Sequence, residues 1–321
     1  MSLLVVGSVA LDDIEAPAGS VKGVLGGAAS YFGVAASFFV PVRVVAVVGE
    51  DFPEEHLRFL RGRGLDLTGV QRVPGRTFRW GGRYHDSLNQ RDTLFTELGV
   101  FEHFDPKIPP AYRDSEWVFL ANIQPTLQRG VLEQTRAPRF SAMDTMNFWI
   151  TGARPELEKT LARVNGLVIN DEEARQLTGE SNLVRAAEAI RALGPSVVIV
   201  KRGEHGALLF DDAGVFAAPA FPLREVQDPT GAGDSFAGGL MGALASAGEL
   251  SRDALRQAMI YGSVLASFCV ERFSLGSPAR PDPRRHRPPL RRIPKPHPIL
   301  TPSFGRSFVV QMPQARPFSS R

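Results

Sequence analysis

Residues 228–239 read Asp-Pro-Thr-Gly-Ala-Gly-Asp-Ser-Phe-Ala-Gly-Gly and stand directly before an apolar stretch that predicts a helix to about Ala247. Small residues at a helix start leave successive backbone N–H groups uncovered at the positive end of the helix dipole, which suits an anion such as phosphate. Asp234, in the first turn, would stand beside that anion and could accept a proton from an attacking hydroxyl. A simpler interpretation is that Asp228 or Asp234 caps the helix and the glycines form a tight turn. The length of the string favours the anion site.

Outside this string, apolar strand-like runs alternate with amphipathic helical stretches. This alternation is typical of a parallel sheet with helices on both faces, and it predicts an α/β fold built as a three-layer α/β/α sandwich with a mainly parallel sheet. The predicted strands are Leu3–Val9, Val42–Val48, Trp117–Leu120, Phe140–Asp144, Gly166–Ile169, Val197–Lys201 and Ala207–Phe210.

The segment Arg76–Phe101 has a different pattern, in which polar residues alternate with aromatic or β-branched ones around a turn near Leu88-Asn89. It predicts an antiparallel hairpin that stands off the main sheet, either as a lid over a ligand or as an edge hairpin without a binding role. Its basic side chains could reach an anionic or hydroxylated ligand, although charges on an exposed ribbon usually form a solvated face. These side chains are Arg79, Arg83, His85 and Arg91.

Charge is distributed unevenly along the chain, whose net charge is +3 and whose pI is near 9.2. Residues 276–321 hold nine Arg, one Lys and one Asp, which leaves residues 1–275 with 27 basic and 33 acidic side chains, a net charge of −6. The basic pI is therefore a property of the tail. Because the body has no basic face interleaved with aromatic residues, we expect no nucleic-acid partner.

The same 276–321 tail contains 11 of the 25 prolines and lacks a sustained apolar period. Such a segment buries too little surface to offset its ordering entropy, so we expect it to be disordered apart from a short strand at Ser307-Phe-Val-Val310. A natural regulatory tail can have this composition, and so can a coding region read in a shifted frame. A frameshift near codon 276 is our hypothesis, and the predicted folded domain is 1–275.

The cysteine count and the first residues bear on location. The single Cys269 cannot form an internal disulfide, and no Cys/His cluster offers the ligands of a structural zinc site. The opening apolar run Ser2–Leu11 lacks a basic segment before it and is far shorter than the ~20 residues that span a bilayer. We therefore expect a buried strand, a cytoplasmic protein and no membrane partner.

The string at 228–239 resembles the C-terminal signature of the ribokinase-like (PfkB) carbohydrate kinase family, and other matches follow in the family's order. They are Gly7-Ser8 followed by Asp12, Gly26-Gly27 with Gly49-Glu-Asp51, Asn170-Asp-Glu-Glu173, and Lys201-Arg-Gly-Glu-His-Gly206. The resemblance covers residues 1 to about 275. It implies a ribokinase-like fold with a small β lid that includes about 76–101, and ATP-dependent phosphorylation of a hydroxyl on a sugar or sugar-like polyol.

The resemblance also implies roles on the phosphoryl side. Asp234 would be the catalytic base, and the backbone of Gly231, Ala232 and Gly233 would be the anion hole. Asn170 and Glu173 would organise Mg²⁺ around the ATP phosphates, although read alone they form a helix capping box. The nucleotide side would be lined by Lys201, Arg202, Gly203 and Gly206. Asp228 and the carbonyl of Thr230 would be candidates for a monovalent-cation site, such as one for K⁺.

On the acceptor side, the resemblance assigns substrate hydroxyls to Asp12 beside Gly26 and Gly27. The family usually has Asn where this chain has Tyr31, so the usual furanose-binding pattern cannot be assumed. Asp144 and Asn147 follow a predicted strand at the carboxyl edge of the sheet, where open α/β folds bind ligands, and we place them in the pocket.

Three readings of the function remain open. A sugar kinase is the first, and the second is a nucleoside kinase of the same fold in which Tyr31 or an aromatic residue of the lid stacks on a base. A non-catalytic regulatory protein on a kinase scaffold is the third, but it would have no physical need for Asp234 together with Asn170 and Glu173. The resemblance also allows a homodimer through the lid.

Overall fold

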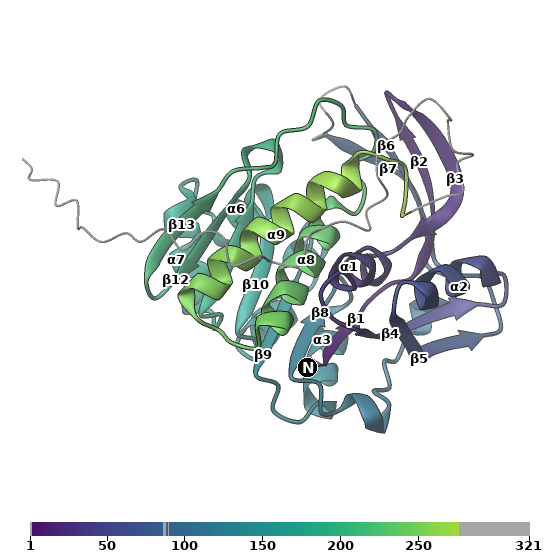
Figure 1. The fold of residues 1–321 in the computed structure, drawn as a ribbon, viewed down its shortest axis with the longest axis horizontal. Helices are drawn as coiled ribbons and strands as arrows, with labels where there is room; N and C mark the ends of the chain where they lie inside the picture. The colour runs from purple at the N-terminus through teal and green to yellow at the C-terminus, as the bar shows by residue number, and fades with distance from the viewer. Residues whose placement is uncertain (1, 86–87, 89, 276–321) are drawn as a thin grey trace, which may run out of the picture. The chain divides into compact units, whose positions relative to one another are not determined.

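The computed structural model describes residues 2–85, 88 and 90–275, and its central element is a large, mainly parallel sheet (Figure 1). The strands lie in the order β13-β12-β11-β10-β9-β8-β1-β4-β5, and those at β12 and β13 are antiparallel to their neighbours. Their bounds are β1 (Leu3–Val6), β4 (Val42–Gly49), β5 (Leu65–Val73), β8 (Trp117–Leu120), β9 (Phe140–Asp144), β10 (Gly166–Asn170), β11 (Val197–Lys201), β12 (Ala207–Asp211) and β13 (Gly214–Ala218).

Helices cover both faces of this sheet because its central strands are apolar on both sides. In β1, Leu3 and Val5 pack into one core cluster, whereas Leu4 and Val6 pack into the other. Helices α1 (Ala28–Ala36), α2 (Glu54–Gly62), α8 (Ala232–Ala247) and α9 (Arg252–Val270) supply the first cluster. The second receives α3 (Pro125–Gln134), α4 (Asn147–Gly152), α5 (Arg154–Leu161), α6 (Asp171–Thr178) and α7 (Leu183–Ala192). The predicted three-layer α/β/α fold is confirmed.

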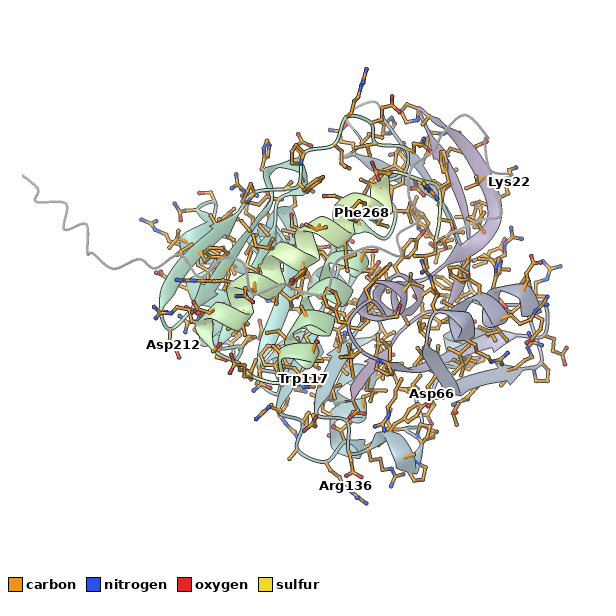
Figure 2. The ribbon with its side chains drawn as sticks, viewed as in Figure 1. Lys22, Asp66, Trp117, Arg136, Asp212 and Phe268 are labelled. Atoms are coloured by element: carbon orange, nitrogen blue, oxygen red, sulfur yellow. The ribbon has the colours of Figure 1, made fainter. Side chains whose placement is uncertain are left out.

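Short 3₁₀ turns complete the described chain: η1 (Gly99–His103), η2 (Pro110–Tyr112) and η3 (Gly203–His205). Trp117 on β8 is fully buried among the core side chains, whereas the charged Lys22, Asp66 and Asp212 are exposed (Figure 2). No helix in the ranges listed above is long and apolar enough to cross a membrane.

Helix α8 is packed closely against its neighbours because its glycines leave room for them. A Cβ at Gly238 would overlap the carbonyl oxygen of Phe32 in α1, and one at Gly242 would lie 2.9 Å from the Cα of Ala36. On another side of the helix, a Cβ at Gly239 would lie 3.0 Å from the Cα of Gly262 in α9. Figure 1 shows α1, α8 and α9 side by side on the near face of the sheet. The start of α8 is therefore fixed against α1.

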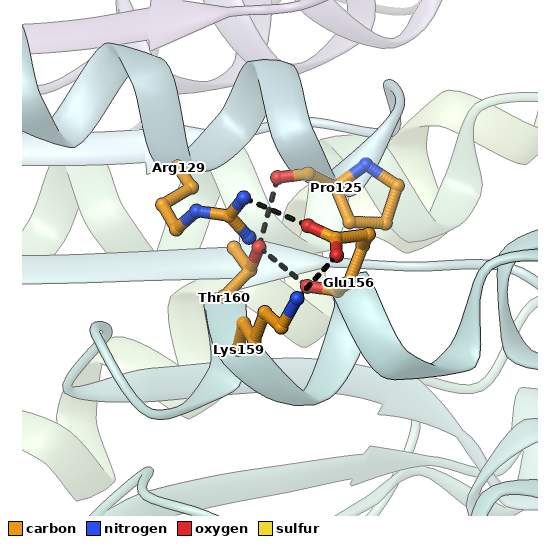
Figure 3. Close-up of polar contacts among 5 residues, drawn as sticks. All are labelled: Pro125, Arg129, Glu156, Lys159 and Thr160. Atoms are coloured by element: carbon orange, nitrogen blue, oxygen red, sulfur yellow. Dashed lines mark hydrogen bonds and ion pairs between the residues drawn. The ribbon is translucent and has the colours of Figure 1, made fainter.

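On the other face, polar contacts join α3 to α5 (Figure 3). Arg129 donates to Glu156 at 2.7 Å, and the hydroxyl of Thr160 donates to the carbonyl oxygen of Pro125 at 2.8 Å. Lys159 adds a second ion pair to Glu156 at 2.6 Å. These contacts hold α3 and α5 together.

A second, smaller sheet has the order β3-β2-β6-β7. It consists of β2 (Ala10–Ala16), β3 (Gly19–Gly26), β6 (Arg79–Tyr84) and β7 (Arg91–Glu97). The antiparallel pairing of β6 with β7, in which Tyr84 faces Arg91, confirms the predicted hairpin. Strands β2 and β3 were not predicted, because acidic residues and glycines interrupt their apolar pattern. We call the four strands the lid sheet.

The first predicted strand, Leu3–Val9, ends at Val6 because the chain leaves the large sheet at Gly7. A Cβ at Gly7 would lie only 2.7 Å from that of Ala121, so a bare residue lets the chain pass there on its way to β2. The predicted tail 276–321 lies outside the described residues, and so does Asn89 of the predicted turn. The domain boundary at 275 stays a prediction.

Candidate active site

Polar side chains collect where neighbouring strands of the large sheet end. Asp144 closes β9, Asn170 closes β10 and Lys201 closes β11. Since these strands are parallel and adjacent, their carboxyl ends meet at one edge of the sheet, which is where open α/β folds bind ligands. The start of α8 places Asp234 close enough to Lys201 and Asp144 for their charges to interact: Lys201 lowers the pKa of Asp234, and Asp234 raises the pKa of Asp144. The fold thus brings together side chains from four separate elements, and one of them, Asp144, had been predicted in the substrate pocket.

The segment Gly231–Gly233 begins α8, and we call it the anion loop. Gly231 is the N-cap, with a left-handed φ of 74°, and a Cβ there would overlap the ring of Tyr31. The N–H of Ala232 donates to the carbonyl oxygen of Pro229 at 3.2 Å. The N–H groups of Gly233 and Asp234 occupy first-turn positions that lack an acceptor within their own helix. The loop therefore offers amides to an anion, with Ala232 already engaged.

Asp234 has the electrostatics of a base that works near neutral pH. Burial raises the pKa of its carboxyl to about 6, while the cations Lys201 and Arg91 act in the opposite direction. Lys201 approaches because Gly233 is bare: a Cβ there would lie 2.6 Å from the lysine Nζ. Arg91 comes from strand β7 of the lid sheet. A carboxyl with this pKa is mostly ionised at pH 7 and can still take up a proton.

The turn after Lys201 forms as its glycines predict. The N–H of Arg202 donates to the carbonyl oxygen of Gly206 at 2.8 Å, and Gly203 opens the 3₁₀ turn between them. Gly206 has a φ of 82°, and a Cβ there would overlap the carbonyl oxygen of Ala218. Contact of this turn with a nucleotide stays a prediction.

Asn170 and Glu173 form a complete capping box at the start of α6. The N–H of Glu173 donates to Asn170 Oδ1 at 2.7 Å, and the N–H of Asn170 donates to Glu173 Oε2 at 3.1 Å. Burial raises the pKa of Glu173, and the nearby Lys201 opposes this. The capping interpretation is therefore confirmed, and each side chain keeps a second polar atom for another partner.

Asp144 is a buried carboxylate beside these groups. Burial, and then the negative charge of Asp234, hold its pKa well above the usual range. Its Oδ1 is buried and has no hydrogen-bond partner among the described residues. This orphaned hard oxygen fits the outer shell of a hydrated Mg²⁺. No group of three or more His, Cys, Asp or Glu in the described part of the chain is placed to hold a metal ion by itself.

The candidate cation residues Asp228 and Thr230 already have protein partners. Asp228 accepts the N–H of Thr230 on Oδ1 at 2.8 Å and the N–H of Ser274 on Oδ2 at 3.3 Å. The Thr230 carbonyl oxygen accepts from the thiol of Cys269 at 3.5 Å. A monovalent-cation site at these residues stays a prediction.

Asp12, which the resemblance assigns to the acceptor side, lies on β2 and is buried. Its contact with an acceptor stays a prediction. Burial, followed by the charges of Asp228 and Asp234, raises its pKa to about 8. A Cβ at Gly26 would overlap its carboxylate, and one at Gly27, where φ is 91°, would lie 2.5 Å from the carbonyl oxygen of Ser8. The glycine pair is thus required for the Asp12 side chain and for the chain's entry into α1.

Tyr31 and Asn147 lie differently from what an acceptor pocket would need. Tyr31 is 1% exposed, its ring packs on the bare Gly231, and its hydroxyl has no hydrogen-bond partner among the described residues. Asn147 is exposed at the start of α4, and its Oδ1 accepts the N–H of Phe148 at 2.9 Å. Asp144 lies near Asp234 and Lys201, on the phosphoryl side. Acceptor roles for these three residues stay predictions.

Sequence reasoning gave too little weight to the lid residues Trp80, Tyr84 and Arg91. Asp12 of β2 is the register partner of Trp80 in the parallel β2–β6 pair, so their side chains share one face of the lid sheet. Tyr84 lies on that face by the two-residue period of the strand. The alternation of Trp80, Gly82 and Tyr84 in the sequence was the available signal, but the strand that carries Asp12 had not been predicted.

The pKa of Asp12 gives a testable pH dependence of stability. The pKa of Asp12 is about 8 in the folded protein and near 3.9 in the unfolded chain, so folding disfavours its ionised form. The contribution of Asp12 to the free energy of unfolding is therefore fully present below about pH 4 and is lost as the pH rises to about 8. Asp12→Asn should therefore raise Tm more at pH 8 than at pH 4.5, by at least about 3 °C. Differential scanning fluorimetry at both pH values measures this.

The matched control is Asp13→Asn on the same strand. Asp13 accepts the N–H of Gly23 at 2.8 Å and pairs with Arg79 at 3.2 Å, so its replacement should not stabilise the protein at either pH. A Tm of Asp12→Asn at pH 8 equal to that of wild type would show that Asp12 is not a buried, destabilising charge.

Known proteins of several kinds resemble this chain. The model of the pfkB family of carbohydrate kinases matches residues 3–282. A cytidine kinase from Thermococcus kodakarensis is 33% identical over 250 residues, which cover 75% of this chain and 87% of that protein. A nucleoside kinase from Methanothermobacter thermautotrophicus is 27% identical over 232 residues, covering 71% and 72%. A 2-dehydro-3-deoxygluconokinase from Thermoproteus tenax is 26% identical over 257 residues, covering 73% and 77%.

Solved structures agree on the fold. The nucleoside kinase of Methanocaldococcus jannaschii superposes with a TM-score of 0.70 at 22% identity, over 84% of this chain and 92% of that chain. Aminoimidazole riboside kinase from Salmonella enterica, in complex with aminoimidazole riboside and an ATP analogue, gives a TM-score of 0.68 at 21% identity, over 85% and 94%. At these identities the structures establish the ribokinase-like fold alone.

Proposed function

The chain belongs to the pfkB family of carbohydrate kinases, and from this premise we propose that its acceptor is a nucleoside. Proteins of this family that resemble it are named cytidine, nucleoside, aminoimidazole riboside and sugar kinases. Its reaction is accordingly the ATP-dependent phosphorylation of a hydroxyl on a sugar or a nucleoside. The choice of a nucleoside over a free sugar rests on the lid sheet.

The observation that carries the proposal is the position of Trp80. Its indole extends over Gly82, where a Cβ would overlap the ring, and it is only half-buried on the face that also holds Asp12. An aromatic surface beside a group that binds ribose hydroxyls suits a planar base, since stacking needs only a π face. Tyr31 is buried and cannot take this role without moving.

Arg91 contributes to the same surface. Its flat guanidinium lies over the Trp80 ring at 5.1 Å from the centroid and also acts electrostatically on Asp234. A flat base would take the place of the guanidinium on the ring, and the cation would turn toward the phosphates of ATP. Closure of the lid over the acceptor would then also bring the positive charge of Arg91 to the phosphoryl side.

The chemistry follows from the arrangement around Asp234. Its carboxylate takes the proton of the attacking hydroxyl, the hydroxyl oxygen forms a bond to the γ-phosphorus, and the bond from phosphorus to the bridging oxygen breaks to release ADP. Anion-loop amides and Lys201 stabilise the negative charge that spreads over the transferred group. A hydrated Mg²⁺ held by Asn170, Glu173 and Asp144 would neutralise phosphate charge when bound.

Three further proposals concern a homodimer, a monovalent cation and the location of the protein. The exposed Leu94 and Leu98, at 43% and 42%, mark the β7 side of the lid sheet as the surface of a homodimer, which light scattering would test. A K⁺ effect would appear as activation by K⁺ over Na⁺ and would require Ser274 to release Asp228. A cytoplasmic location follows from the single cysteine.

Trp80→Ala tests the acceptor class. We expect the KM for cytidine to rise about 10–100-fold, because one base–aromatic stack is lost. The KM for ATP, and that for ribose as a poor acceptor, should stay within about twofold. Trp80→Phe, which keeps a π face, is the matched control and should retain most of the affinity. Initial rates of ADP release give all these values.

Two results would contradict the nucleoside proposal. One is an equal rise in KM for ribose and for cytidine, which would make Trp80 a general structural residue. The other is a wild-type preference for ribose over cytidine, which would make the protein a sugar kinase.

A further inference from the structure

The lid sheet and the loop that precedes α8 are joined by a buried hydrogen bond. The hydroxyl of Thr230 donates to the hydroxyl oxygen of Tyr84 on β6 at 3.1 Å. Both residues are 8% exposed and lie 146 positions apart in the chain. Thr230 stands directly before the anion loop. This bond therefore connects the acceptor-facing side of the lid to the backbone that would face the γ-phosphoryl group.

A second link reaches the same loop from the opposite side of the lid. Asp228 accepts the N–H of Ser274 at 3.3 Å, and the Ser274 hydroxyl donates to the carbonyl oxygen of Leu25 on β3 at 2.6 Å. Asp228 in turn accepts the N–H of Thr230 at 2.8 Å. The segment Asp228–Thr230 is thus connected to β6 through Tyr84 and to β3 through Ser274.

The order of the strands in the lid sheet places β2 between the two linked strands. β2, which carries Asp12, lies between β3 and β6. The strands on both sides of β2 are therefore linked to the segment Asp228–Thr230: β6 directly through Tyr84, and β3 through Ser274. Any displacement of β2 that β6 shares must stretch the Tyr84–Thr230 bond or move the anion loop with it.

We propose that Tyr84 is a positioning residue that couples the lid to the anion loop through its hydrogen bond with Thr230. When an acceptor holds the lid in place, the bond fixes Thr230, and with it the direction of the N–H groups that follow. The inference requires phosphoryl transfer and is independent of whether the acceptor is a nucleoside or a sugar.

The neighbours of Tyr84 fit this role. Its register partner across the hairpin is Arg91, the lid cation that acts on Asp234. Burial raises the pKa of the Tyr84 phenol, so it stays protonated and neutral throughout the working pH range. Small errors in the placement of stabilising groups lower the rate strongly, and an open lid lets water compete with the acceptor for the phosphoryl group.

Tyr84→Phe removes the hydroxyl and keeps the ring. We expect kcat to fall about 3–10-fold, as for one lost neutral hydrogen bond, with little change in the KM for ATP. The ratio of ADP released to acceptor phosphorylated should rise above one, because water gains access. Thr230→Val should give the same pattern, and the double variant should be no worse than the more impaired single variant. Thr230→Ser, which keeps a hydroxyl, should be close to wild type.

Tyr112→Phe is the matched control. Tyr112 is also a buried tyrosine, and its hydroxyl donates to the carbonyl oxygen of Asp66 at 3.2 Å, in the second core cluster. This variant should lower Tm as Tyr84→Phe does and leave kcat and the ADP-to-product ratio unchanged. The comparison separates positioning from a general loss of stability.

A readout that needs no acceptor completes the test. Hydrogen exchange of peptides that cover 228–236 should quicken in Tyr84→Phe and stay unchanged in Tyr112→Phe. Independent, multiplying effects of Tyr84→Phe and Thr230→Val on kcat, or unchanged exchange in 228–236, would overturn the proposal. A wild-type protein that phosphorylates no acceptor would overturn the assigned reaction, and the exchange result would still decide the coupling.

Discussion

Asp234→Asn is expected to lower kcat by about 10²–10⁴-fold, which is the usual cost of losing a general base. Asn has nearly the shape of Asp but cannot accept the proton of the attacking hydroxyl. The first turn of α8 should form unchanged, because the cap of this helix is Gly231 and involves no side-chain hydrogen bond. The KM for ATP should therefore change by no more than about twofold to threefold.

The pH profile gives the same prediction an independent check. With a pKa of about 6 for Asp234 in the free enzyme, the wild-type kcat/KM should fall about tenfold per pH unit below that value, since the ionised form is the active one. The residual activity of Asp234→Asn should lack this acid limb. Turnover within a factor of about three of wild type would remove Asp234 from the mechanism.

Gly231→Ala is expected to lower kcat by about 10²–10³-fold, the range seen when one donor to a developing negative charge is lost. Two features of the position act together. Its φ of 74° is strained for any residue with a Cβ, and that Cβ would overlap the ring of Tyr31. Because Tyr31 is fully enclosed, the loop must move away from it, and the amides of the anion loop would turn with the loop.

Gly179→Ala separates these two features. Gly179 follows α6 with a φ of 75°, and no atom lies within 4 Å of a Cβ added there. This control should show the strain of the left-handed backbone as a lower Tm, with kcat unchanged. A Gly231→Ala enzyme as active as Gly179→Ala would mean that the anion loop does not stabilise the transferred group.

The centre of the large sheet could be predicted from sequence because its strands are continuous apolar runs. Strands β8 to β12 were predicted with boundaries that differ from the structure by one residue at most. The edge strands β5 and β13 escaped prediction. Exposed polar residues interrupt the apolar pattern of β5, whereas β13 is a short strand of small and apolar residues whose first four positions are not buried. Local composition thus specifies a strand that is buried on both faces better than one at an edge.

That the residues predicted for the phosphoryl side lie near one another could be predicted because their signals are local. Asn170 and Lys201 each end a strand, and Asp234 lies in the first turn of a helix, each within its own motif. The acceptor side could not be predicted, because it depends on contacts between distant segments. Tyr31 appeared to be a ligand-facing aromatic, but the bare Gly231, 200 positions later, lets its ring pack inward. The Tyr84–Thr230 hydrogen bond likewise joins residues 146 positions apart, and no sequence motif signals it.

The central claim is that this chain transfers a phosphoryl group from ATP to a nucleoside hydroxyl with Asp234 as the base. The most direct measurement incubates the full-length protein with ATP, Mg²⁺ and equal concentrations of cytidine and ribose, and identifies the phosphorylated products by mass spectrometry. Asp234→Asn is run in parallel. We predict cytidine monophosphate as the main product of the wild type, with at most about one hundredth of that rate from the variant. Ribose phosphate as the main product, or equal product from both proteins, would contradict the account.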